Sequence, residues 1–201
     1  MEIIAKGAEA VLMKKEVDIL VKRRIGKGYR IKEIDEKLRK LRTRQEARLL
    51  EKAAKVTNVP KFLNVDEVNK EVVMQFIPGK KLSEELNNLP LKQQEEICKK
   101  IGEEIAKLHD LNIIHGDLTT SNILLKEDKI YFIDFGLGFI SSRIEDKAVD
   151  LHLLKEALEA KHFMHWKLLF EKVLEEYKKS QNSEKVIKQF EKVEKRGRYK
   201  H

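Results

Sequence analysis

One local pattern limits the folds open to this chain more than any other feature of its sequence. Residues 115–122 read His-Gly-Asp-Leu-Thr-Thr-Ser-Asn, and Asp134-Phe135-Gly136 begins twelve residues after Asn122. Apolar runs at residues 123–125 and 130–133 predict a short hairpin between the two motifs. Such a hairpin would return Asp134 to the loop that carries Asp117 and Asn122, so that all three side chains face one cleft.

These side chains suit phosphoryl transfer from ATP. That reaction needs Mg²⁺ to neutralise the phosphate oxygens and a group that orients the incoming oxygen. Asp117 would face the acceptor hydroxyl or water, while Asn122 and Asp134 would bind the metal. Each motif alone is weak, but six fixed positions in this order match by chance at well below about one in a thousand. We therefore predict a catalytic centre at this loop.

Apolar patterning divides the chain into two parts. Short apolar or β-branched runs predict five strands, at residues 2–5, 10–13, 17–23, 62–65 and 72–76. Helical spacing predicts a helix over residues 35–54, and its buried side should carry Leu38, Leu41, Leu49 and Leu50. The first three strands should form a meander, and the helix should be inserted between the third and fourth strands.

A hinge is predicted at Ile77-Pro78-Gly79, where a stiff residue stands beside a permissive one. After it, residues 90–108 carry apolar side chains every three or four positions, and helical patterns resume over residues 146–194. We expect a single α+β domain. Its parts would be a five-stranded N-lobe with one helix, a hinge, a mostly helical C-lobe and an unstructured basic tail, at residues 1–76, 77–79, 80–195 and 196–201.

Charge is unevenly distributed along the chain, whose formal net charge is +8. Residues 22–48 hold 12 Lys/Arg against 4 Asp/Glu, and the last seven residues hold 4 Lys/Arg and no acid. These segments either form solvated helix faces or bind a polyanion such as RNA. The single cysteine, Cys98, excludes an internal disulfide, and no apolar run suits a signal peptide or a membrane span. We expect a cytoplasmic protein with no membrane partner.

The two motifs resemble the catalytic loop and the Asp-Phe-Gly of the protein-kinase-like superfamily. The resemblance implies a minimal bilobal protein-kinase-like fold, in which a lysine on the third strand pairs with a glutamate on the following helix. Lys22 and Glu46 stand at the matching positions, and Arg23 and Arg24 are competitors of Lys22. The resemblance thus adds Lys22 and Glu46 to Asp117 as candidate catalytic residues.

The sequence also departs from ordinary protein kinases. Lys6-Gly7-Ala8 supplies one glycine where a glycine-rich loop is expected, so the charge of Lys6 would substitute for free backbone approach. Gly116 replaces the arginine that usually precedes the catalytic aspartate, and no Ala-Pro-Glu follows Asp-Phe-Gly. We therefore expect neither an activation switch nor a platform for a peptide substrate.

Several further segments are similar to the small atypical kinase of the archaeal KEOPS (EKC) complex. They are Lys-Gly-Ala-Glu-Ala from Lys6, Lys-x-Arg-x-x-Lys-Gly-Tyr-Arg from Lys22, Arg-Thr-x-x-Glu-Ala-Arg from Arg42, Glu-Asp-Lys-Ala-Val-Asp-Leu from Glu145 and a terminal Arg-Gly-Arg. The resemblance implies ATP and Mg²⁺ as cofactors, and a role in forming N6-threonylcarbamoyladenosine in tRNA. It also implies two partners, a threonylcarbamoyl transferase subunit and a small regulatory subunit.

The same resemblance suggests where ATP and RNA would lie. The ATP contacts expected are Ala5, Lys6, Gly7, Ala8, Val11, Lys22, Met74, Gln75, Ile77 and Leu124, with Gln75 and Ile77 acting through their backbones. On the tail, Arg196, Arg198 and Lys200 would reach tRNA phosphates, a partner subunit or the ATP site. The basic residues Lys27, Arg30, Arg39 and Lys40 would extend the RNA surface.

Two alternatives stay open. The chain could be a free-standing Ser/Thr or small-molecule kinase of the RIO or aminoglycoside type, or a pseudokinase that serves as a scaffold. A cationic small-molecule substrate would require an acidic pocket in the helical part, and no acidic cluster follows Asp150. Retention of Lys22, Asp117, Asn122 and Asp134 argues against a pseudokinase.

Overall fold

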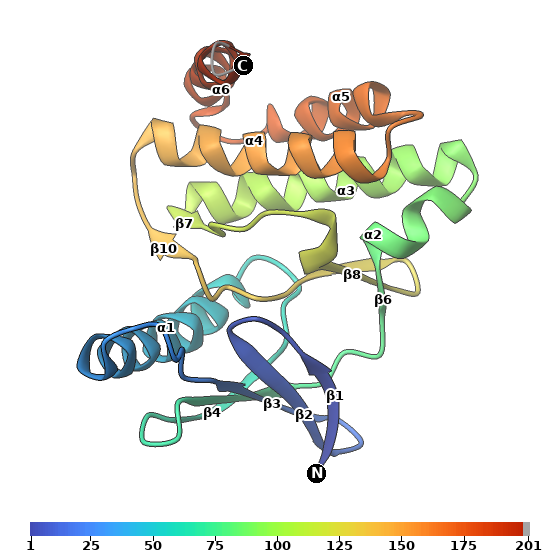
Figure 1. The fold of residues 1–201 in the computed structure, drawn as a ribbon. Coiled ribbons are helices and arrows are strands. Elements are labelled where there is room, and N and C mark those ends of the chain that lie inside the picture. Colours follow the sequence, from blue (N-terminus) through green and yellow to red (C-terminus); the bar gives the residue numbers. More distant parts are fainter. Residues whose placement is uncertain (199–201) are drawn as a thin grey trace.

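The N-terminal part of the chain is a five-stranded antiparallel sheet. The computed structural model describes residues 1–198, which form two lobes (Figure 1). The strands of the sheet are β1 (Glu2–Lys6), β2 (Ala10–Glu16), β3 (Ile19–Arg24), β4 (Phe62–Asp66) and β5 (Glu71–Gln75). They lie in the order β1-β2-β3-β5-β4, so β1 to β3 form the predicted meander.

Helix α1 (Lys32–Ala53) lies between the sheet and the helical lobe (Figure 1). It begins three residues before the predicted start. Leu49 and Leu50 are buried, as the helical spacing predicts, but Leu38 is only partly buried and Leu41 is 55% exposed. The prediction for Leu41 was wrong because the buried face runs through Thr43, and two residues separate these positions by about 200° around a helix.

The chain crosses between the lobes after β5. Residues 77–79 lead to β6 (Lys80–Lys81), which pairs with the hairpin strand β8 (Ile123–Lys126). A short helix, α2 (Leu82–Glu85), and a 3-10 turn at Leu86–Asn88 follow. These short elements were not predicted, because they are fixed by packing of Leu82 and Leu86 into the core rather than by a repeating pattern.

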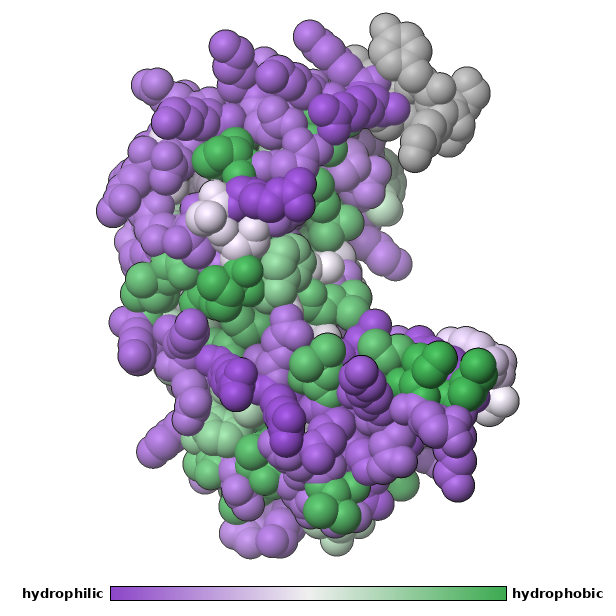
Figure 2. Space-filling model, turned by 90° about the vertical axis from the view of Figure 1, so that its left-hand side faces the viewer, coloured by the Kyte–Doolittle hydropathy of each residue, from purple (hydrophilic) through white to green (hydrophobic). Residues whose placement is uncertain are grey.

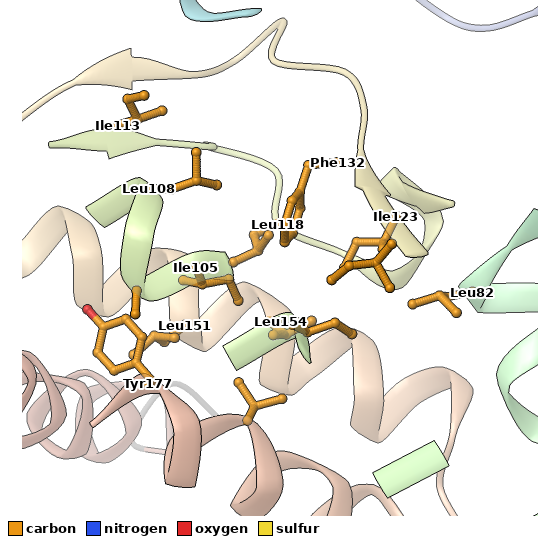
Figure 3. Packing of buried hydrophobic residues seen from close by; sticks show 14 of the residues in the cluster. Leu82, Ile105, Leu108, Ile113, Leu118, Ile123, Phe132, Leu151, Leu154 and Tyr177 are labelled. Carbon is orange, nitrogen blue, oxygen red and sulfur yellow. The ribbon is translucent and has the colours of Figure 1, made fainter. Parts of the chain in front are cut away.

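The C-terminal part is built from four longer helices. They are α3 (Leu91–Asp110), α4 (Ile144–Lys161), α5 (Trp166–Tyr177) and α6 (Ser183–Arg198). Helix α3 packs against α5, where a β-carbon at Gly102 would lie 2.1 Å from the carbonyl oxygen of Val173. Only glycine allows the two backbones to approach so closely. Leu108, Leu151, Leu154 and Tyr177 belong to the buried hydrophobic cluster of this lobe (Figure 3).

The C-terminal residues differ from the predicted unstructured tail. Helix α6 continues to Arg198, and Arg196 Nη1 lies 2.8 Å from Glu145 Oε1 on α4. The expectation of an irregular segment from residue 196 was therefore wrong for Arg196 and Arg198, while Lys200 lies outside the described residues. Within residues 1–198, no helix combines the length and the apolar composition required to cross a bilayer.

Candidate active site

The catalytic loop is held between two short pairs of strands. Its start follows β7 (Ile113–Ile114), which pairs with β10 (Phe139–Ile140), and its end leads through a 3-10 turn into β8. Strand β9 (Lys129–Phe132) completes the predicted hairpin with β8 and carries the chain to Asp134. Both motifs therefore reach the same place, although the β7–β10 pair was not foreseen.

Asn122 closes the loop on Asp117. The Nδ2 group of Asn122 donates to the Asp117 carbonyl oxygen at 2.9 Å and to its Oδ2 at 2.8 Å. This leaves the Asn122 amide oxygen without a partner in the described part of the chain. An amide oxygen next to a carboxylate is a suitable ligand for a hard cation such as Mg²⁺.

The molecular surface is hollowed between the two lobes (Figure 2). Asp134 of the helical lobe contacts Lys22 of the sheet across the lobe junction. Its φ of 63° lies in the left-handed region, which is costly for a residue with a β-carbon and is found most often at functional sites. The Oδ1 atom accepts hydrogen bonds from Lys22 Nζ at 2.6 Å and from the Gly136 N–H at 3.1 Å. The side chain remains 47% exposed, so the second carboxylate oxygen is open to a ligand.

The structure brings Lys22 and Glu46 together, with 2.7 Å between Nζ and Oε1. The second Glu46 oxygen contacts Arg24 Nη2 at 2.5 Å. Alternation along β3 places Lys22 and Arg24 on the inner face, while Arg23 points outward to Glu71. The competition among the three cations is thus resolved by the strand: Lys22 is the one that reaches Asp134, and Arg24 is a second partner of Glu46.

The charges in this cluster determine one another's ionisation. Burial by itself would lower the pKa of the Lys22 ammonium, but the carboxylates of Glu46 and Asp134 outweigh burial and raise the pKa above its ordinary value. Burial would likewise raise the pKa of Asp134, yet Lys22 holds that pKa below its usual value. Lys22 and Asp134 are therefore both charged at neutral pH, which is the state that a phosphate clamp and a metal ligand would require.

His115 is fully enclosed and supports the loop in its neutral form. Burial lowers the pKa of its imidazole, although Asp150 and the carbonyl of Ile133 oppose this shift. The Nε2 atom lies 3.1 Å from the Ile133 carbonyl oxygen, and Nδ1 lies 3.4 Å from the Asp117 nitrogen. A ring that donates from Nε2 and accepts at Nδ1 satisfies both contacts without a net charge.

Asp150 on α4 anchors the backbone of the same loop. Its Oδ2 accepts the His115 N–H at 2.6 Å and its Oδ1 accepts the Gly116 N–H at 2.9 Å. Asp150 belongs to the segment that begins at Glu145 and resembles the KEOPS kinase, but no role was predicted for Asp150 from the sequence. A lone aspartate between Val149 and Leu151 in a core-facing helix was the available signal, because a buried carboxylate needs nearby donors.

Gly116 has a structural reason to replace the usual arginine. Its φ is 77°, and a β-carbon at this position would lie 2.3 Å from the carbonyl oxygen of Leu137. A side chain would push away the segment that follows Asp-Phe-Gly. The absence of the arginine therefore allows this segment to lie directly on the catalytic loop.

The residues expected around adenine differ in how exposed they are and in whether their backbone groups are free to bind a base. Met74 and Ile77 are buried, whereas Val11 and Leu124 are partly exposed. The Gln75 N–H already donates to the carbonyl oxygen of Lys61 at 2.9 Å, so only its carbonyl could contact a base. The Ile77 N–H has no hydrogen-bond partner within residues 1–198 and is the available donor of this connection.

The turn that would cover the phosphates is held by a backbone hydrogen bond and by contacts with two basic residues. Gly7 donates its N–H to the Ala10 carbonyl at 2.9 Å, and Lys27 Nζ contacts the carbonyl of Ala8. Glu9, the next residue, pairs with Arg42 on α1. The expected contacts Ala5 and Lys6 belong to the exposed strand β1 beside this turn. Contacts with basic residues therefore hold in place a turn that further glycines would have made flexible.

The donor set fits Mg²⁺ and ATP. Asn122 and Asp134 provide hard oxygen ligands, and Lys22 provides a buried cation next to them. These groups come from β3, the catalytic loop and the segment after β9, so only the folded chain assembles them.

Comparisons with known proteins agree with this geometry. Residues 13–139 match the family model described as the RIO domain. The whole chain is 43% identical to "KEOPS complex subunit Bud32" of Pyrococcus abyssi, covering 97% of that protein. It is 44% identical over 205 residues to a "Probable bifunctional tRNA threonylcarbamoyladenosine biosynthesis protein" of Methanobrevibacter smithii, of which it spans 37%.

Among solved structures, the chain is similar to the Rio2 kinase of Chaetomium thermophilum in its ADP/Mg²⁺–phosphoaspartate complex. The TM-score is 0.65 at 15% identity, and the match covers 98% of this chain and 70% of the other. At this identity the likeness establishes the fold: an α+β, RIO-type kinase fold, which is that of ATP-using phosphotransferases and ATPases. The chain belongs to the RIO-domain family and, within it, to the family of the KEOPS subunit Bud32.

Proposed function

We propose that this chain is a Mg²⁺- and ATP-dependent kinase or ATPase that supports N6-threonylcarbamoyladenosine formation in tRNA as a KEOPS subunit. The observation that carries the proposal is the assembled cluster in which Lys22 contacts both Glu46 and Asp134, close to the Asp117–Asn122 loop. The names of two relatives, a KEOPS subunit and a threonylcarbamoyladenosine biosynthesis protein, support the biological setting.

In the proposed reaction each residue has one task. Bound Mg²⁺ would neutralise the phosphate oxygens of ATP. Lys22 would hold the phosphates, with Glu46 fixing the position of its ammonium group. Asn122 and Asp134 would hold the metal, and Asp117 would accept a proton from the attacking oxygen.

The attacking oxygen is proposed to be that of water or of a Ser/Thr hydroxyl. The segment after Asp-Phe-Gly supports water, because only the residues 137–143 separate the motif from α4. Part of this short segment is the strand β10, which is paired to β7. A peptide substrate would therefore find little surface beside Asp117, and ATP hydrolysis is the simpler activity.

We further propose that the chain works in the cytoplasm with a threonylcarbamoyl transferase subunit, a small regulatory subunit and tRNA. The Methanobrevibacter smithii relative named bifunctional supports the first partnership, since this chain spans only 37% of that protein's length. Arg196 lies on the surface of α6 and is 67% exposed in its side chain, which supports a contact with tRNA phosphates.

Phosphate release from Mg²⁺-ATP by the purified chain, alone and with tRNA and the partner subunits, tests the proposal. Asp117→Ala and Lys22→Ala should each lower turnover by about 10²-fold or more, because proton acceptance and phosphate binding are lost. Asp128→Ala and Lys129→Ala change exposed residues of the β8–β9 hairpin and serve as matched controls. Undiminished turnover in both active-site variants would rule the activity out.

A further inference from the structure

A cavity lies at the junction of the two lobes, and the catalytic cluster does not line it. It has a volume of about 340 Å³ and is lined by the end of α1, the α1–β4 connection, the start of β4 and one residue of β9. Lys22, Asp117, Asn122 and Asp134 do not line it. A volume of this size matches small-ligand pockets, which begin at about 300 Å³.

The α1–β4 connection, which lines the cavity, is bonded to both lobes. Helix α1 ends at Ala53, and the chain turns back through Thr57, whose N–H donates to the Ala53 carbonyl at 3.0 Å. The carbonyl oxygen of Asn58 then accepts the Phe132 N–H of β9 at 3.0 Å. Backbone hydrogen bonds thus hold the connection to α1 on one side and to β9 on the other, and residues of this connection line the cavity. Figure 1 shows the chain running from the end of α1 to β4.

Polar groups without partners surround the cavity. Thr57 is 9% exposed, and its hydroxyl oxygen is buried with no hydrogen-bond partner among the described residues. In residues 1–198, the side chains of Asn58 and Lys61 and the hydroxyl of Tyr131 also have no hydrogen bond or ion pair. Buried polar groups in native proteins are normally paired, so an unpaired hydroxyl beside a cavity points to a missing partner.

The remaining lining consists of the Glu51 carboxylate and of apolar and aromatic side chains. Phe62 and Tyr131 contribute rings, while Ala54 and Val59 contribute aliphatic surface. Rings next to hydroxyl and amide groups suit a flat heteroaromatic ligand that has donors and acceptors on its edge. Lys61 supplies a cation on the rim, where a phosphate attached to such a ring would be attracted.

We propose that this cavity binds a nucleobase with its phosphate, as a site separate from the ATP cleft. The base would contact Phe62 and Tyr131, the Thr57 hydroxyl would turn toward the base edge, and Lys61 would contact the phosphate. The ligand chemistry is the same whether the base belongs to a free mononucleotide or to an unpaired position of an RNA strand. The site does not depend on the activity proposed above.

Amide chemical shifts of the full chain, recorded with the ATP cleft saturated by Mg²⁺-ADP, test this site. The two probes are adenosine monophosphate and an unpaired tetraribonucleotide that contains adenosine. We expect added shifts at Thr57, Asn58 and Tyr131. Tyr131→Leu removes the ring and should weaken binding about tenfold, and Thr57→Val removes only the hydroxyl and should weaken it about fivefold.

Tyr29→Leu is the matched control, since Tyr29 is an exposed tyrosine outside the cavity, and it should change mononucleotide affinity by less than about twofold. Shifts with both probes would identify free nucleotide as a sufficient ligand, and shifts with the tetraribonucleotide alone would identify RNA. Absence of shifts at the cavity with either probe, or equal affinity in Thr57→Val and the unmodified chain, would overturn the proposal. Because Thr57→Val preserves side-chain shape, this comparison stands even if Tyr131→Leu fails to fold.

Discussion

Glu46 and Asp150 are both 1% exposed, but they support the active site in different ways. Glu46 is bonded to the side chains of Lys22 and Arg24, at 2.7 and 2.5 Å. Asp150 accepts backbone N–H groups of the catalytic loop, at 2.6 and 2.9 Å. One carboxylate thus positions a cation, and the other fixes the main chain.

This difference separates a part of the site that can rearrange from a part that cannot. Lys22 divides its ammonium between Glu46 and Asp134, so a phosphate entering the cleft can replace one partner without leaving a buried charge alone. Asp150 has no such freedom, because moving it would leave two buried N–H groups unpaired. We therefore expect Asp150 to matter most for stability and the Lys22 cluster to matter most for nucleotide binding.

The largest effect should come from Asp150→Ala. Two charge-assisted hydrogen bonds are lost and two buried amides are left unsatisfied, which should lower the free energy of unfolding by about 4 kcal/mol. Urea unfolding measures this change, with exposed Asp128→Ala as the control. A loss no greater than that of the control would mean that Asp150 does not anchor the loop.

Glu46→Gln should have the next largest effect. The substitution keeps the shape but leaves the charges of Lys22 and Arg24 buried with Asp134 as the remaining carboxylate partner, which should cost about 2–3 kcal/mol of stability. The affinity for Mg²⁺-ATP should fall as well. Glu33→Gln on the exposed face of α1 is the control, measured by unfolding and by nucleotide titration. If nucleotide affinity stayed unchanged, the expectation that the Lys22 cluster rearranges to bind nucleotide would be wrong.

Gly116→Ala tests whether the main chain of the catalytic loop, which Asp150 anchors, can move. The new β-carbon would be forced against the Leu137 carbonyl at a φ of 77°, so we expect about 1–2 kcal/mol of destabilisation and slower ATP turnover. Gly28→Ala is a close control, because a β-carbon at Gly28 would meet no atom within 4 Å. Equal stability of the two variants would show that the contact with Leu137 is relaxed at little cost.

The smallest effect concerns pH. Lys22 holds the pKa of Asp134 below its ordinary value, so the ionised carboxylate adds stability above about pH 4, which is lost as pH falls further through the lowered pKa. Asp134→Asn should therefore flatten the acid dependence of the unfolding free energy by less than about 1 kcal/mol, since the side chain is half exposed and screened. Unfolding curves between pH 5 and pH 2 for both proteins, at about 0.1 M salt, provide the measurement. Parallel curves would contradict the ion pair.

The predicted parts of the site were those with local or repeating signals. Asp117 and Asn122 share one loop, and Asp134 follows a hairpin whose strands could be read from apolar runs. The lobes, the sheet and the long helices were visible for the same reason. Leu41 and the unstructured tail were the failures: an apolar residue in a helix does not reveal which face is buried, and basic composition does not reveal that Arg196 lies on a helix against α4.

The sequence by itself determined which chemistry we propose for this protein, because the residues that suit Mg²⁺ and phosphate occur at spacings that a loop and a hairpin bring together. Tertiary structure decided how those residues are supported. Arg24 became the second partner of Glu46, Asp150 became the anchor of the loop, and Gly116 became a contact point with Leu137. The residues in these contacts are 21 to 35 positions apart in the sequence. They meet only because β3 packs near α1, and because α4 and the segment after Asp-Phe-Gly lie on the catalytic loop. No local sequence pattern reveals such contacts.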